Sequence, residues 1–200
     1  MKTAIAKALF NSYSYEEYKK LISDLLLEGK ATGKVQSENL THYSLLNQTR
    51  MNRLDKTIKI TEENKVKLNT LKQEYIWLVI SEGWCGDAAQ LLPIFHKMAL
   101  ESNKKIEMKI ILRDENEEVM HYFLTNGTRS IPKLILIDKQ TGSVLGDWGP
   151  RPKEAMALIK NYKKEHAVID ETAKTALQIW YLHNKGLSAQ NEIIDLMKNL

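Results

Sequence analysis

The pattern of apolar and polar positions centres on residues 75–97. Tyr75 to Ile80 is a short apolar run rich in β-branched and aromatic residues, which is typical of a strand buried on both faces. Gly83 and Gly86 interrupt this pattern, and helical spacing follows at Leu91, Leu92, Phe95, Met98 and Ala99. The stretch therefore predicts a buried strand, a tight turn and a helix, which Pro93 is expected to kink.

The residues before this stretch predict mainly helices. Ser14 and Glu17 have the spacing of a capping box, and Gly29 is suited to end the helix that follows. A second helix is predicted over 40–54, a short edge strand over 57–60, and a third helix from Thr61 to about residue 73. On the helix over 40–54, Arg50, Arg53 and Lys56 are expected to face water, and the expected core positions are Leu45, Leu46, Met51 and Leu54. On the helix that begins at Thr61, they are Val66, Leu68 and Leu71.

Strands and helices alternate after the central stretch. A second buried strand is predicted over 106–112, and a helix from about residue 116 to Asn126 with Gly127 as its cap. Strands over 134–137 and 143–148 form a hairpin, and helices follow over 153–165, 170–184 and 188–198. The apolar residues of the last two helices are expected to pack on the core.

Length and charge favour one compact protein without a nucleic-acid surface. The 200 residues are 43% hydrophobic, and the formal net charge of +4 comes from basic and acidic residues that are interleaved along the chain. Met1 to Phe10 lacks the unbroken apolar segment of a secretory leader, and no run approaches the roughly 18 apolar residues of a membrane span. A cytoplasmic location is expected, in agreement with a single cysteine.

The sequence offers little support for a metal, phosphate or hydrolase site. The five histidines stand far apart, and one cysteine cannot form a structural zinc site unaided. Gly-rich phosphate-binding loops are absent, and a Cys-His-Asn hydrolase has no local signature here. We expect neither a metal nor a bound cofactor.

Cys85, the only cysteine, falls at the first turn of the predicted helix. Unpaired N–H groups and the helix dipole stabilise a thiolate there, so a lowered pKa and a reactive thiol are expected. The alternative is a small buried residue without a chemical role. Asp87 is ambiguous, because its charge favours the helix start but raises the pKa of a neighbouring thiol.

Two motifs give this chain a specific resemblance. Trp84-Cys85-Gly86 follows a strand and begins a helix with Pro93 eight residues after the cysteine, and Ser130-Ile131-Pro132 precedes another strand. Together they resemble the active-site turn and the cis-proline loop of the thioredoxin family. The resemblance implies an α/β thioredoxin-like fold, with a central mixed sheet flanked by helices and Pro132 facing Cys85. It covers residues 57–165, with helical extensions over 1–56 and 166–200 that pack with them as one unit.

A narrower resemblance and two departures qualify this family likeness. Trp-Cys-Gly-Asp-Ala-Ala-Gln and Trp-Gly-Pro-Arg-Pro, at 84–90 and 148–152, are similar to a bacterial subgroup of thioredoxin-like proteins. The second cysteine of the family's Cys-x-x-Cys pair is replaced by Ala88, and the buried acid six residues before the first cysteine is replaced by Val79. The attacking thiol is therefore present without its resolving partner.

The resemblance implies thiol-disulfide exchange by a monothiol mechanism, or redox sensing, with Cys85 as the attacking group. A disulfide-bearing protein or a small-thiol substrate would contact Trp84, Gly86, Asp87, Ile131 and Pro132. Glutathione or another external thiol would then resolve the mixed disulfide. Two alternatives stay open: a catalytically inactive thioredoxin-fold binding or scaffold module, and a dimer that pairs Cys85 from two chains.

Overall fold

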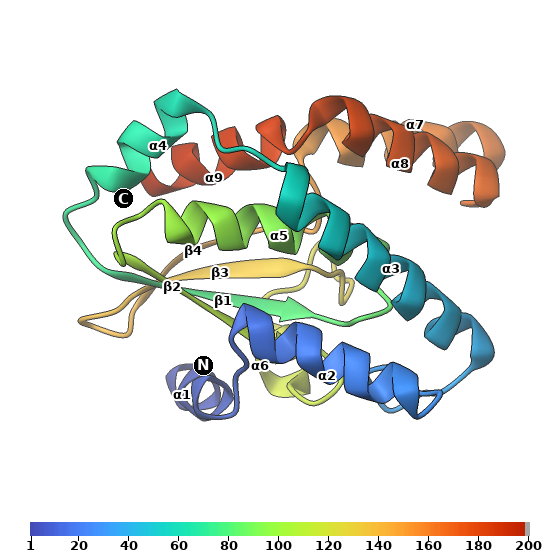
Figure 1. Cartoon of the computed structure of the whole chain (residues 1–200), viewed down its shortest axis with the longest axis horizontal. Helices are drawn as coiled ribbons and strands as arrows, with labels where there is room; N and C mark the ends of the chain where they lie inside the picture. The colour runs from blue at the N-terminus through green and yellow to red at the C-terminus, as the bar shows by residue number, and fades with distance from the viewer. Residues whose placement is uncertain (199–200) are drawn as a thin grey trace.

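A four-stranded sheet forms the centre of the computed structural model, which describes residues 1–198 (Figure 1). The strands are β1 (Tyr75–Ser81), β2 (Ile106–Leu112), β3 (Lys133–Asp138) and β4 (Val144–Trp148), arranged in the order β2-β1-β3-β4. β1 pairs in parallel with β2 and antiparallel with β3, and β3 pairs antiparallel with β4. The sheet is thus mixed and flanked by helices, as expected for a thioredoxin-like fold.

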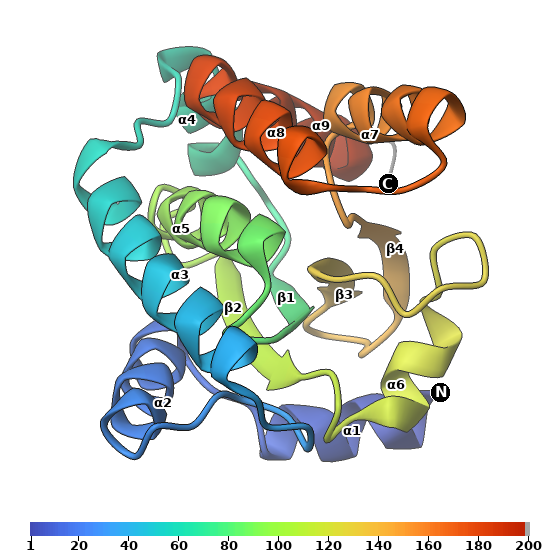
Figure 2. The ribbon, with the colours of Figure 1, turned by 90° about the vertical axis from the view of Figure 1, so that its right-hand side faces the viewer.

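Helices cover both faces of this sheet (Figure 2). One layer contains α1 (Lys2–Phe10), α2 (Tyr15–Leu27) and α6 (Glu117–Tyr122). The other contains α4 (Glu62–Asn69), α5 (Gly86–Leu100), α7 (Lys153–His166), α8 (Glu171–Asn184) and α9 (Leu187–Lys198), while α3 (Glu38–Thr57) runs along the side beside α5. The N-terminal and C-terminal helices therefore pack on the same core as the sheet.

Local sequence signals explain where several helices begin. Ser14 and Glu17 form the predicted capping box of α2, with each side chain bonded to the other's backbone N–H. Thr61 and Asp170 cap α4 and α8 in the same way, by accepting from the third residue of the helix. These bonds satisfy N–H groups that the helix itself leaves unpaired.

The predicted edge strand over 57–60 is wrong. Ile58 and Ile60 are buried, but they lie in a connection without regular structure. Side chains satisfy its backbone in place of a neighbouring strand. The Gln190 amide donates to the Lys59 carbonyl at 3.1 Å and accepts from the Thr61 N–H at 3.1 Å. Local patterning could not predict this contact, because Gln190 lies in a helix far along the chain.

The predicted inward faces of two helices also need correction. Met51, Leu54 and Leu68 are buried as predicted, but Leu45, Leu46 and Val66 are 53%, 45% and 63% exposed. The buried side of α3 is offset from the predicted one and includes Ser44 and Asn47, because it meets the backbone of the turn before α5. The spacing of apolar residues along α3 could not reveal that polar residues lie on its buried side.

The helix predicted to end near Asn126 is shorter. α6 ends at Tyr122, and Gly127, with φ of +75°, lies instead in a turn closed by two hydrogen bonds between Thr125 and Thr128. Among residues 1–198, no helix is both long and apolar enough to cross a bilayer.

Candidate functional site

The turn after β1 places Cys85 at the start of α5. Cys85 is the N-cap residue, and its Sγ accepts the N–H of Ala88 at 3.4 Å. Its own N–H donates to the Glu82 carbonyl at 3.0 Å, which closes the turn. The thiol thus occupies the position that serine or threonine takes in an ordinary helix cap.

The loop before β3 meets this thiol from the opposite side. The Ile131–Pro132 peptide bond is cis, and the Cys85 thiol donates to the Ile131 carbonyl at 3.4 Å. All the predicted site residues therefore gather at the start of α5, although Ala88 stands where a resolving cysteine would be. Cys85 is only 8% exposed.

The pKa of the Cys85 thiol is raised to about 12, opposite to the direction predicted from its place at the helix start. Burial is the largest cause, because it disfavours the charged thiolate, and the negative charge of Asp87 adds to it. The N–H groups of Ala88 and Asp87 and the charge of Arg151 act in the other direction, but burial outweighs them. Cys85 is consequently a neutral thiol at physiological pH.

Asp87 is held by the C-terminal part of the chain. Its carboxylate accepts from Arg151 Nε at 2.8 Å, pairs with Arg151 Nη2 at 2.6 Å, and accepts from the Tyr181 hydroxyl at 2.9 Å. Burial and the Asp87 charge raise the pKa of Tyr181 well above its usual value. Arg151 belongs to the Trp-Gly-Pro-Arg-Pro motif, but no sequence signal marked Tyr181 as a contact of the turn that holds Cys85.

The N-terminal part of the chain holds the other side of the turn. The Trp84 indole N–H donates to the Thr32 carbonyl at 3.2 Å, and the Gly83 N–H donates to the Thr32 hydroxyl at 2.8 Å. Asn47 on α3 donates to the Gly83 carbonyl at 3.0 Å. The Arg113 guanidinium lies 4.8 Å from the centre of the Trp84 ring, a distance suited to a cation–π contact.

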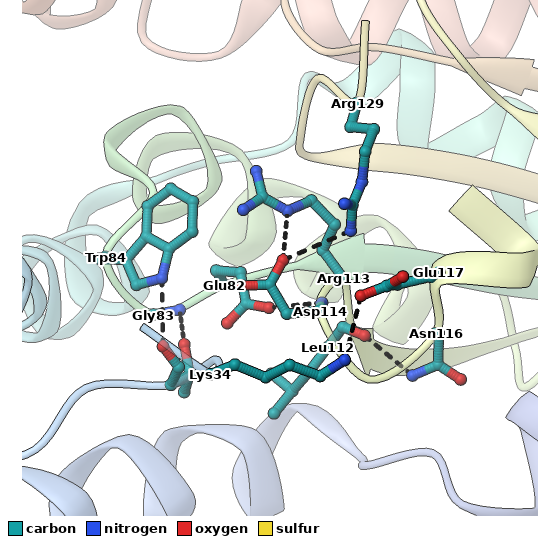
Figure 3. A network of polar contacts seen from close by, with 11 residues as sticks. Lys34, Glu82, Gly83, Trp84, Leu112, Arg113, Asp114, Asn116, Glu117 and Arg129 are labelled. Carbon is teal, nitrogen blue, oxygen red and sulfur yellow. Dashed lines mark hydrogen bonds and ion pairs between the residues drawn. The ribbon is translucent and has the colours of Figure 1, made fainter. Parts of the chain in front are cut away.

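A buried carboxyl group lies beside this turn, at Glu82 (Figure 3). Its Oε1 accepts the Asp114 N–H at 3.0 Å, and the Asp114 carboxylate contacts Arg113 at 2.9 Å and Arg129 at 3.5 Å. Burial raises the pKa of Glu82, while Thr32 and the Asp114 N–H oppose this rise. The chain thus has a buried acid three residues before Cys85, which the spacing of the family motif did not reveal.

The described residues contain no group of three histidine, cysteine, aspartate or glutamate side chains arranged to hold a metal ion. The chemistry available at the turn is therefore that of one thiol, a buried carboxyl group and an Asp87–Arg151 ion pair.

Comparisons with known proteins agree with this architecture. Two solved structures each cover 94% of this chain with a TM-score of 0.59. One is a Pseudomonas aeruginosa protein of unknown function, which is 16% identical in sequence and of which 98% is covered. The other is an HIV epitope scaffold, which is 18% identical and of which 99% is covered. At such identities the likeness concerns the fold alone. No curated protein matches the sequence. A family model described as thioredoxin matches residues 33–164, about two thirds of the chain. The chain therefore belongs to the thioredoxin family.

Proposed function

We propose that this protein carries out thiol-disulfide exchange through Cys85 by a monothiol mechanism. The observation that carries the proposal is the position of Cys85 Sγ, between the Ala88 N–H and the Ile131 carbonyl next to a cis-proline. A disulfide substrate that reaches this sulfur is attacked by the thiolate form. One S–S bond forms to Cys85 as the substrate's own S–S bond breaks, and the departing sulfur takes the electron pair and a proton.

The raised pKa of Cys85 determines how such a protein would behave. A thiol of high pKa is a poor leaving group, so a mixed disulfide at Cys85 breaks slowly once formed. Ala88 cannot resolve it, and an external thiol such as glutathione must attack it. These properties support slow capture and release of a thiol partner, which suits redox sensing better than rapid reduction of many substrates.

A turnover assay tests this function. The wild type is mixed with glutathione and bis(2-hydroxyethyl) disulfide, with Cys85→Ser as the control and Ala88→Cys alongside. We expect slow wild-type turnover that Cys85→Ser abolishes. Turnover by Ala88→Cys alone would refute the proposal, because the fold would then support redox chemistry that the natural sequence does not perform.

The second candidate is a binding or scaffold module in which Cys85 has no chemical role. The small exposed fraction of Cys85 and its raised pKa favour it, since both limit attack by the thiolate. Thiol labelling separates the two candidates. A Cys85 that no disulfide reagent modifies in the folded protein would favour the binding module.

A further inference from the structure

A groove of about 710 Å³ opens beside the active-site turn, between α3 and α8. In Figure 2 these two helices flank the start of α5, so both extensions of the thioredoxin-like part contribute to it. Trp84, Gly86 and Asp87, which belong to the turn that holds Cys85, are part of its lining, whereas Cys85 itself is not. The volume lies within the roughly 300–1,000 Å³ of typical small-molecule sites.

The groove carries an excess of positive charge. Its lining includes four cations, Arg50, Arg53, Arg151 and Lys174, and two carboxylates, Asp87 and Glu171. Arg151 is paired with Asp87, and Lys174 contacts Glu171 at 2.6 Å. Arg50 and Arg53 are therefore the cations of the lining that can interact with a bound anion.

Arg50 and Arg53 lack a carboxylate within ion-pair distance in residues 1–198. Arg50 is half-buried and donates from Nη1 to the neutral Asn47 amide oxygen at 2.6 Å. Burial lowers the pKa of Arg50, as does the neighbouring Arg53 charge, while Asp87 opposes the shift. A half-buried cation without a counter-ion loses hydration without gaining an ion pair, so a bound anion would stabilise it.

The position of Arg50 places this charge beside the turn that holds Cys85. A side chain built on Gly86 would have its Cβ 3.8 Å from Arg50 Nη1, so the guanidinium lies against the first residue of α5, next to Cys85 in sequence. The remaining lining combines the exposed apolar side chains Leu46, Ile179 and Leu182 with neutral polar ones such as Gln90 and Gln178. A ligand that fits both parts has an anionic group beside Gly86 and an apolar portion beyond it.

We propose that the groove binds a small disulfide whose non-reacting part bears a carboxylate or phosphate, with Arg50 and Arg53 holding that anion. The proposal rests on the exchange function above and specifies its substrate class. Cys85 forms a bond to one sulfur of the bound disulfide, the original S–S bond breaks, and the other half leaves as a thiol after taking up a proton. The disulfide itself is the oxidant, so no further reactant is needed.

Three small disulfides of similar size test the role of charge: the dianion 3,3′-dithiodipropionate, the neutral bis(2-hydroxyethyl) disulfide and the dication cystamine. The rate of mixed-disulfide formation at Cys85 is followed by intact-protein mass spectrometry. We expect the dianion to react about 10-fold faster than the neutral compound, since a charge-assisted hydrogen bond contributes about that factor. The dication should react most slowly. Equal rates for dianion and neutral compound would overturn the proposal.

Arg50→Gln and Arg53→Gln should each reduce the preference for the dianion. Lys56→Gln is the matched control, because it removes one positive charge from an exposed position on the same helix outside the groove lining. An equal loss of preference in Lys56→Gln would contradict the proposal by showing that general charge is responsible. Glutathione disulfide and coenzyme A disulfide then distinguish a carboxylate from a phosphate as the preferred anion.

Calorimetry on Cys85→Ser separates failure of this inference from failure of the exchange function. Saturable binding of 3,3′-dithiodipropionate that Arg50→Gln removes would support the groove even if Cys85 proves unreactive. Exchange in the wild type without preference for charge would leave the proposed function intact and refute the groove proposal. Binding of an acidic peptide, with no binding of the small dianion, would also refute it.

Discussion

Cys85 should react slowly with a small disulfide reagent in the folded protein, and its rate should rise with pH far beyond the range of a free thiol. Because the pKa of the thiol is about 12, its reaction rate should still be rising with pH at pH 10. Because this is the only cysteine, the same chain unfolded in urea provides the reference. There the thiol should titrate near its ordinary pKa of about 8.5.

Two opposing effects determine the magnitude. At pH 7.5 a thiol of pKa about 12 is ionised to roughly 3 parts in 100,000 and one of pKa about 8.5 to roughly 10%, a ratio of about 3,000. A more basic thiolate is also a better nucleophile, which recovers roughly 25- to 55-fold over this pKa difference. Ionisation outweighs nucleophilicity, so folded Cys85 should react roughly 50- to 120-fold more slowly than the unfolded chain.

The assay is the absorbance change as 4,4′-dithiodipyridine, a small neutral disulfide, reacts with the protein between pH 6 and 10. Cys85→Ser gives the blank. A rate in the folded protein that levels off with an apparent pKa at or below about 8.5 would refute the reasoning. It would mean that the helix start and Arg151 outweigh the burial of the sulfur.

Three further substitutions test other parts of the structure. Asp87→Asn should lower the pKa of Cys85, because it removes a nearby negative charge, and should cost roughly 3–5 kcal/mol in unfolding free energy, because Arg151 loses its buried partner. Tyr181→Phe keeps the Asp87 charge and should not lower the pKa of Cys85; a lowered pKa in this variant would contradict the role given to Asp87. Because the pKa of Glu82 is raised in the folded protein, its protonated form stabilises wild type at low pH, and this stability is lost as pH rises from 4.5 through the folded pKa. Glu82→Gln does not titrate, so its unfolding free energy in urea should increase relative to that of wild type over this range, and a difference that stays constant with pH would count against the assignment. Gly149→Ala should lower the unfolding free energy by roughly 3 kcal/mol or more, because Gly149 has φ of +121° and the added Cβ would lie 2.3 Å from the Pro132 carbonyl oxygen. Gly142→Ala also has positive φ but no atom near the added Cβ, so it should cost clearly less, and equal shifts in Tm for the two variants would contradict the clash at Gly149.

Much of the sheet could be predicted because its residues carry a local signal. β1 is a nearly continuous apolar run, and β2 alternates apolar and charged residues before it becomes apolar at its end; both observed strands lie within a residue of the predicted ones. The position of Cys85 at the start of α5 likewise followed from the break at Gly83 and Gly86. Signals of this kind depend on neighbours in sequence and need no knowledge of the tertiary contacts.

The electrostatics of the site could not be predicted, because they depend on residues distant in sequence. Tyr181 and Arg151 reach Asp87 across 94 and 64 positions, and Arg50 was expected in water although its guanidinium lies beside Gly86 at the start of α5. The pKa of Cys85 also depends on residues distant in sequence. Its helix position favours a thiolate, but the burial that reverses this preference comes from the packing of the whole fold.

The central claim is that Cys85 exchanges disulfides, and the most direct measurement is the intact mass of the folded protein after incubation with glutathione disulfide. We expect slow addition of one glutathionyl group, which is absent in Cys85→Ser and which excess reduced glutathione removes. A folded protein that stays unmodified, while the urea-unfolded chain takes up the group, would contradict exchange at Cys85 and favour a thioredoxin-fold binding module.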